Sequence, residues 1–193
     1  RANQPYQYAD YSIFVAEVAS TCNEELLFDH LMKTLDDEKQ KIYLLNQWLD
    51  GFRGTVFRQT MFAEFEHLIH EMDAKGEAIT ADKLTTVYYE LNKKYFGDAM
   101  TIDEEIGLEW ARIPHFYYNY YVYQYATGQS AATALSKQIL EEGQPAVDRY
   151  INNFLKAGCS DFPIEVLKAA GVDMESPEPI ALACQVFEEK LVE

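Results

Sequence analysis

The sequence predicts an all-α fold built from roughly eight helices. Apolar residues recur at helical spacing over most of the 193 residues, and capping residues, glycines and prolines separate these segments. Alternation of β-branched residues at strand spacing is absent. No internal repeat and no low-complexity linker divides the chain, so residues 1–193 are predicted to form a single domain.

Two long helices are predicted at the start of the chain. The turn-forming residues 10–12 precede a helix that continues to about Lys33. Acidic residues at 36–38 open the second helix, because the helix macrodipole favours negative charge at its N-terminus. Apolar residues at helical spacing carry this helix toward Ile69, and the glycines at 51 and 54 can bend it.

The rest of the chain is predicted to form shorter helices, each marked by a start or stop signal. Thr80 can cap one helix, and Thr-Ile-Asp-Glu at 101–104 matches the capping box that opens another. Gly158 and Gly171 each follow a lysine near a helix end, while Ser176 and a following proline open the last helix. The remaining helices are predicted at residues 80–97, 116–126, 129–142, 144–157 and 162–170. Alternatively, residues 116–142 form one helix that is broken near Gly128.

The composition excludes several classes of function. Lys and Arg total 16 and Asp and Glu total 32, so the net charge is -16. Nucleic acid and anionic membrane surfaces are therefore excluded as main partners, because both require a basic face. No apolar run is long enough to span a membrane. Three widely spaced cysteines form no disulfide framework, so we expect a reducing compartment and a cytoplasmic protein.

One carboxylate interrupts the apolar run of the first predicted helix. Glu17 lies within Ile13–Ala19, and no lysine or arginine is within a helical turn of it. A buried carboxylate is strongly unfavourable unless it is paired or coordinates a metal. Glu17 is therefore either a partly exposed or distantly paired residue, or a metal ligand or catalytic acid.

Three segments carry a resemblance to a known family. They are residues 4–21, which include Phe-Val-Ala-Glu ending at Glu17, residues 58–66, and the tyrosine-rich residues 110–128. Together they resemble oligoendopeptidase F, in the thimet-oligopeptidase group of zinc metallopeptidases, over essentially the whole chain. The resemblance implies hydrolysis of internal bonds of short peptides, with zinc as cofactor and Glu17 as the third zinc ligand.

The family's His-Glu-x-Gly-His motif, which supplies two zinc ligands and the general base, is absent from this chain. Its four histidines, at positions 30, 67, 70 and 115, lie in no such pattern. In the family the motif lies shortly before the point where this chain begins. We therefore expect the C-terminal part of a catalytic domain, whose partner is the missing N-terminal part of the same enzyme. Catalytic zinc needs three protein ligands, so we expect this piece alone to be inactive.

The resemblance also assigns a catalytic role to His115 and to tyrosines that follow it. The family places a histidine and several tyrosines over the zinc, where hydrogen-bond donors stabilise the developing oxyanion. Helical spacing from His115 favours Tyr118 and Tyr121, whereas a direct overlay on the family favours Tyr120 and Tyr123. The catalytic set is predicted as His115, Tyr118, Tyr121 and Tyr123, with Tyr120 in reserve. For each tyrosine the alternative is core packing with a solvated hydroxyl.

Two further histidine patterns and a non-enzymatic function are alternatives. His67 and His70 share a helix face but lack the spacing of common zinc-peptidase motifs. Glu64 with His67 is one Glu-x-x-His unit, whereas a di-iron bundle needs two. A solvated or salt-bridged face explains both patterns. The rival to the peptidase is an acidic all-helical interaction module that binds a partner through its tyrosine face.

Overall fold

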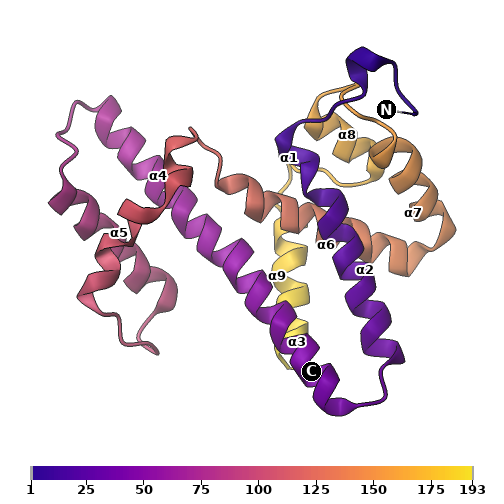
Figure 1. The fold of residues 1–193 in the computed structure, drawn as a ribbon, viewed down its shortest axis with the longest axis horizontal. Coiled ribbons are helices and arrows are strands. Elements are labelled where there is room, and N and C mark those ends of the chain that lie inside the picture. The colour runs from indigo at the N-terminus through magenta and orange to yellow at the C-terminus, as the bar shows by residue number, and fades with distance from the viewer. Residues whose placement is uncertain (1, 193) are drawn as a thin grey trace. The chain divides into compact units, whose positions relative to one another are not determined.

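The computed structural model describes residues 2–192, and its regular elements are helical (Figure 1). These described residues contain no β-strand, which confirms the predicted all-α class. The chain divides into two compact units: one holds the residues up to Arg53 and from Thr127 onward, and the other holds Gly54–Ala126. Each unit has its own buried apolar cluster. The single domain expected for residues 1–193 stays a prediction.

Helices from both ends of the chain form the first unit. A 3₁₀ turn and α-helices come from the N-terminal part, and α-helices with one π-helical segment come from the C-terminal part. Their bounds are Tyr6–Tyr8 (η1), Ile13–Ala16 (α1), Val18–Thr34 (α2), Glu38–Phe52 (α3), Tyr123–Glu142 (α6, from Thr127 onward), Gln144–Arg149 (α7), Tyr150–Leu155 (η5, the π segment), Pro163–Ala170 (α8) and Glu178–Leu191 (α9).

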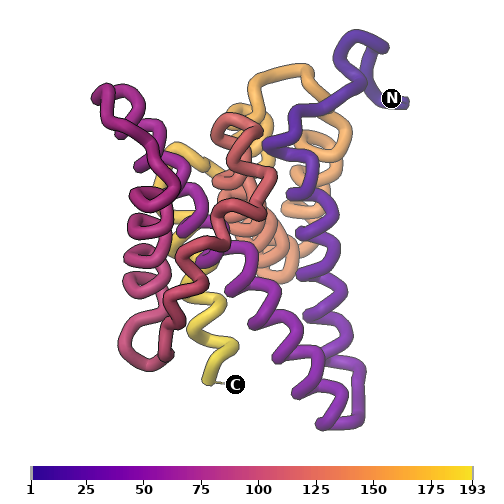
Figure 2. Tube along the Cα trace, turned by 60° about the vertical axis from the view of Figure 1, so that its left-hand side comes forward, coloured from indigo at the N-terminus to yellow at the C-terminus, as the bar shows by residue number. Residues whose placement is uncertain are grey.

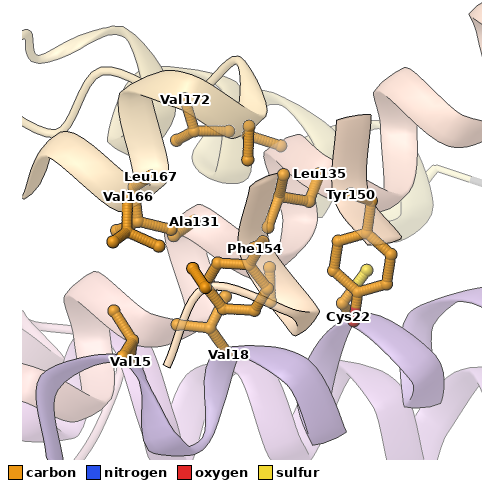
Figure 3. Packing of buried hydrophobic residues seen from close by; sticks show 14 residues of the cluster. Val15, Val18, Cys22, Ala131, Leu135, Tyr150, Phe154, Val166, Leu167 and Val172 are labelled. Carbon is orange, nitrogen blue, oxygen red and sulfur yellow. The ribbon is translucent and has the colours of Figure 1, made fainter. Parts of the chain in front are cut away.

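The core of the first unit lies where α2, α6, η5 and α8 meet (Figure 3). Val18 and Cys22 are one helical turn apart on α2 and point toward the side chains of the other three elements. Leu135, Phe154 and Leu167 meet them from α6, η5 and α8, and all five side chains are buried. The helical spacing of apolar residues that predicted these elements therefore also forms their packing faces.

Close packing of the N-terminal turn requires glycine at position 158. The amide of Cys159 donates to the Tyr8 carbonyl at 3.0 Å, and Figure 2 shows the indigo N-terminal turn beside the orange segment. Gly158 has a φ of +58°, and a Cβ at this position would overlap the Tyr8 carbonyl oxygen. Glycine is the residue that tolerates both conditions, so the predicted helix end here is also a contact point.

The second unit is built on two long helices that are followed by shorter 3₁₀ segments. The edge-to-face contact of Phe65 with Tyr88, at 5.1 Å between ring centroids, lies at the centre of its core. Ile113 and Val122 are buried in the same cluster, so both ends of the segment between them are anchored. The bounds are Arg53–Phe57 (η2, a π segment that begins in the first unit), Arg58–Ala74 (α4), Ala81–Phe96 (α5), Glu104–Arg112 (η3) and Pro114–Tyr117 (η4).

Several predicted helix ends are confirmed by their capping contacts. The Thr80 hydroxyl accepts a hydrogen bond from the Lys83 amide at 3.3 Å. The hydroxyl of Ser176 accepts from the Glu178 amide, the first of α9, at 3.2 Å, although Pro177 takes the N-cap position itself. Gly171 ends α8 in the left-handed region, with a φ of +103°. These signals lie within one turn of the helix end, which is why the sequence reveals them.

The first two predicted helices are each interrupted. α1 ends at Ala16 and α2 begins at Val18, with Glu17 between them at φ -88° and ψ -15°. The helix expected to reach Ile69 changes to π-helical geometry over Arg53–Phe57, a segment that begins two residues after Gly51 and contains Gly54. The expected bend is thus a local insertion in the hydrogen-bond ladder.

The tyrosine-rich segment differs most from its prediction. The expected helix over 116–126 is wrong, because Asn119 and Tyr120 adopt φ values of +50° and +60° and α6 begins only at Tyr123. That helix then continues through Gly128 without a break. The capping box at 101–104 also does not form: η3 begins after Asp103, without a side-chain cap. No helix in the described part of the chain is long and apolar enough to cross a membrane.

Candidate active-site segments

Aromatic rings gather around His115 in the second unit. The Tyr121 ring lies nearly parallel to the imidazole, at 5.8 Å and 18°. Tyr118 and Tyr125 meet the imidazole edge-on, at 5.7 and 6.2 Å. The Tyr125 hydroxyl donates to the Tyr121 hydroxyl at 3.2 Å. This His115 cluster, formed by His115, Tyr118, Tyr121 and Tyr125, therefore collects one imidazole and three phenols that can donate hydrogen bonds.

The residues before His115 explain its position. Pro114 opens η4, and the preceding Ile113 is extended at φ -93° and ψ 99°, as the residue before a proline prefers. Ile113 is also buried in the core of the second unit. A short 3₁₀ turn then begins from a fixed point and carries His115 as its second residue.

The residues after η4 are held against α4. Phe116 packs on Phe62 and Phe65, at 5.5 and 5.1 Å between ring centroids. Residues 118–122, which we call the tyrosine loop, then lead to α6. Within this loop the Tyr120 amide donates to the Glu66 carboxylate at 2.7 Å. α4 therefore holds both the turn before the loop, through Phe116, and the loop itself, through Tyr120.

The structure places the predicted tyrosines in different surroundings. Tyr118 and Tyr121 lie against His115, although no helix connects them and helical spacing is thus the wrong reason for their contact. Tyr120, held in reserve, turns its backbone toward Glu66. Tyr123 is the first residue of α6 and is 41% exposed. The catalytic role of each tyrosine stays a prediction.

Glu17 lies in the first unit, at the junction of α1 and α2. Its side chain is exposed, which favours the exposed alternative over a carboxylate buried in a continuous apolar helix. Its backbone carbonyl accepts from the Thr21 amide at 2.9 Å and from the Ser20 hydroxyl at 3.0 Å. Among residues 2–192 the Glu17 carboxylate forms no hydrogen bond or ion pair, and no three His, Cys, Asp or Glu side chains gather to hold a metal. This carboxylate can therefore supply one ligand to a metal that is held mainly by other groups.

The alternative histidine patterns form exposed or interhelical contacts. His67 lies 3.5 Å from the Glu71 carboxylate on the same helix face, and both side chains are exposed. Glu64 accepts a hydrogen bond from Lys94 at 2.6 Å, and this bond holds the pKa of the Glu64 carboxyl below its usual value. The His70 ring lies against the Tyr120 ring of the tyrosine loop, at 4.4 Å between ring centroids and tilted by 31°. These contacts agree with the salt-bridged face that the sequence left as the simpler explanation.

A second polar network joins α4, α5 and η3. Glu109 accepts hydrogen bonds from Tyr88 and Arg58, both at 2.6 Å, and pairs with Arg112. Burial opposes ionisation of Glu109, but these partners outweigh it and hold its pKa below the usual value. Burial and the same hydrogen bond raise the pKa of Tyr88. The network stabilises the frame on which the His115 cluster rests.

Sequence reasoning missed three residues of these sites: Tyr125, Glu66 and Glu109. Tyr125 stood in the tyrosine-rich segment, four residues after Tyr121, but the direct overlay stopped earlier. Glu66 carries the same signal as Glu17, since it is a carboxylate directly after the apolar Phe65 on a buried helix face. Nothing in the local pattern distinguishes Glu109 from the other acids of the chain.

Comparisons with known proteins identify the same family. Residues 1–186 match the model of Peptidase family M3. Over 193 residues the chain is 72% identical to Oligopeptidase PepF of Bacillus subtilis (strain 168), and this match covers 100% of the chain and 29% of that protein. The chain is 53% identical over 193 residues to Group B oligopeptidase PepB of Streptococcus agalactiae, a match that covers 100% of the chain and 32% of that protein. The crystal structure of oligoendopeptidase-F from Enterococcus faecium is similar with a TM-score of 0.88 and 53% identity, over 94% of this chain and 34% of that one. The chain thus spans about a third of the length of these relatives.

The family model and the relatives agree with the sequence blocks that suggested the resemblance. The match covers all three blocks, at residues 4–21, 58–66 and 110–128. The structural likeness extends over nearly the whole chain at an identity that reflects common descent. The chain belongs to Peptidase family M3.

Proposed function

We propose that the chain is the C-terminal part of the catalytic domain of a zinc metallopeptidase that cleaves internal bonds of short peptides. The observation that carries this proposal is the His115 cluster, which collects hydrogen-bond donors from η4, the tyrosine loop and the first turn of α6 in a family M3 chain. Peptide hydrolysis develops negative charge on the carbonyl oxygen, and such donors stabilise that charge. By itself the chain is inactive, because it lacks two zinc ligands and the general base.

Glu17 is proposed as one ligand of the zinc. Its exposed carboxylate, without a hydrogen bond or ion pair among residues 2–192, fits a ligand whose partner comes from outside this chain. Carboxylate oxygen is a common third ligand beside two histidines. When bound, zinc supplies Lewis-acid polarisation of the scissile carbonyl. The two further ligands belong to the part of the full-length protein that precedes this chain.

Tyr121 is the best-placed donor of the cluster. The Tyr125 hydroxyl lies 3.2 Å from the Tyr121 oxygen and can donate to it, which leaves the Tyr121 proton for another acceptor. Accepting one hydrogen bond also strengthens the one it donates. The near-parallel His115 ring limits the rotation of the Tyr121 ring. Tyr118 and Tyr123, both partly exposed, complete the proposed set of donors.

The charge and cysteines of the chain support the proposed setting. All three cysteines are free: Cys22 is buried, Cys159 exposed and Cys184 intermediate. Free thiols are typical of a reducing compartment, so we place the full-length enzyme in the cytoplasm. Its proposed substrates are short peptides rather than nucleic acids, in keeping with a net charge of -16.

Zinc content of the full-length protein tests the proposal directly. We expect Glu17→Ala to lose most of its zinc and its peptidase activity while helix content stays unchanged. Glu24→Ala is the matched control, because Glu24 is also an exposed acid and lies on α2 two turns further along. Equal zinc content in Glu17→Ala and the parent would remove Glu17 from the ligand set. A full-length protein that neither binds zinc nor cleaves peptides would instead favour the interaction module.

A further inference from the structure

We propose that Glu66 is a positioning residue that holds the tyrosine loop and thereby sets the geometry of the His115 cluster. The inference rests on the proposed function, because it assigns Glu66 a role in the same reaction. Glu66 lies on α4, outside the predicted catalytic set, and its side chain is 1% exposed.

The loop has a backbone conformation that its own residues disfavour. Asn119 and Tyr120 have φ values of +50° and +60°, and no other non-glycine residue of 2–192 has a positive φ. Asparagine adopts this region more readily than other residues, whereas a bulky tyrosine does so rarely. Such a conformation persists only where surrounding contacts enforce it.

Glu66 supplies the contact at the strained residue itself. Its Oε1 accepts a hydrogen bond from the Tyr120 amide at 2.7 Å, a length typical of bonds to a charged acceptor. Within the described residues 2–192 Glu66 has no lysine or arginine partner. A carboxylate buried without a cation is unfavourable unless hydrogen bonds satisfy it. The hydrogen bond that the amide of a strained residue donates to Glu66 therefore indicates that this buried carboxylate holds the loop, a role that a solvated surface carboxylate does not have.

Neighbouring side chains on α4 hold the chain on either side of Tyr118. Phe65, next to Glu66, packs on Phe116 at 5.1 Å, and His70, one turn further, lies against the Tyr120 ring at 4.4 Å between ring centroids. The residues between these two anchor points include Tyr118, whose ring meets the imidazole of His115. If the Tyr120 anchor is released, Tyr118 and the following Tyr121 lose their fixed positions against that imidazole.

The test combines hydrogen exchange with kinetics in the full-length enzyme, for Glu66→Leu and Glu66→Gln. Leucine removes the acceptor, whereas glutamine keeps a carbonyl oxygen at the same place. For Glu66→Leu we expect exchange at the Tyr120 amide to be about 10- to 100-fold faster, as for loss of one hydrogen bond to a charged group. We also expect kcat to fall by about 10- to 100-fold with little change in KM. Glu66→Gln should remain close to the parent in both measurements.

Glu64→Leu is the matched control, because Glu64 is on the same helix but bonds to Lys94 and Tyr95 of α5. It should leave Tyr120 exchange and kcat near the parent values. Unchanged Tyr120 exchange in Glu66→Leu, or an equal increase at all amides of α4 and α5, overturns the proposal. Faster exchange with an unchanged kcat overturns it as well. His115→Ala in the same assay distinguishes failure of the Glu66 proposal from failure of the proposed function. A parent-like kcat in His115→Ala refutes the proposed function, whatever the exchange data show.

Discussion

Replacement of Tyr121 by phenylalanine tests the chemistry of the His115 cluster most directly. The change removes only the hydroxyl, and the phenyl ring can keep its stacked position 5.8 Å from His115. In the full-length enzyme we expect the variant to retain zinc and its melting temperature. Its kcat should fall by about 100- to 1000-fold, the usual effect of removing one oxyanion donor. KM should change little, because the lost bond forms mainly in the transition state.

The structure predicts a graded series rather than a single effect. Tyr125→Phe removes the hydroxyl that bonds to the Tyr121 hydroxyl at 3.2 Å, and should reduce kcat by about fivefold, or about 1 kcal/mol. Tyr43→Phe is the control, because Tyr43 is 67% exposed on α3 of the first unit. Tyr88 and Tyr150 are unsuitable controls, since both are buried and their hydroxyls donate to Glu109 and to a backbone carbonyl.

Steady-state kinetics on an internally quenched peptide, with zinc analysis of each variant, measures this series. A Tyr121→Phe enzyme within a few-fold of the parent would show that Tyr121 is scaffold. A loss in Tyr125→Phe as large as that in Tyr121→Phe would place the essential donor on Tyr125 instead. The same substitution at Tyr118, Tyr120 and Tyr123 then identifies which other phenols act.

Three further predictions use this chain alone. The isolated chain should cleave no fluorogenic peptide when zinc is added, and zinc-dependent cleavage by a clean preparation would contradict the account of the missing ligands. Gly158→Ala should lower the free energy of unfolding by roughly 1–3 kcal/mol, because the added Cβ would overlap the Tyr8 carbonyl and the backbone φ is +58°. Gly51→Ala should raise the free energy of unfolding by roughly 0.5–1 kcal/mol, because no atom lies within 4 Å of the added Cβ and alanine favours the helix. Urea titrations of both variants measure the difference. The pKa of Glu109 is lowered from its usual 4.5, so the ionised carboxylate stabilises the second unit above that pH and this stability is lost as pH falls through the lowered pKa. Glu109→Gln should therefore flatten the acid limb of unfolding followed by tryptophan fluorescence, and an unchanged acid limb would exclude Glu109 as its cause.

Local sequence was sufficient wherever a feature depends on residues within one helical turn. The cap at Thr80, the hydroxyl contact of Ser176 and the left-handed Gly171 were all predicted, because each is set by the residues beside it. The all-α class followed from apolar periodicity in the same way. The family followed from blocks of sequence, which the comparisons confirmed.

The tyrosine loop could not be predicted in this way. Aromatic residues at 116–126 resemble a helix locally, and no glycine marks the positive φ values of Asn119 and Tyr120. The contacts that enforce this conformation come from Phe65, Glu66 and His70, more than 45 positions earlier in the chain. The break at Glu17 was not visible in the apolar run around it, and that run left exposure of the carboxylate as one of two alternatives.

The sequence by itself thus determined the helical class, most helix ends, the family and the residue types available for catalysis. Only the tertiary structure decided which phenols meet His115 and which carboxylate holds the loop that carries them. The physical reason is the range of the interactions: capping and helical periodicity act within a few residues, whereas a strained loop is stable only through bonds to a distant helix.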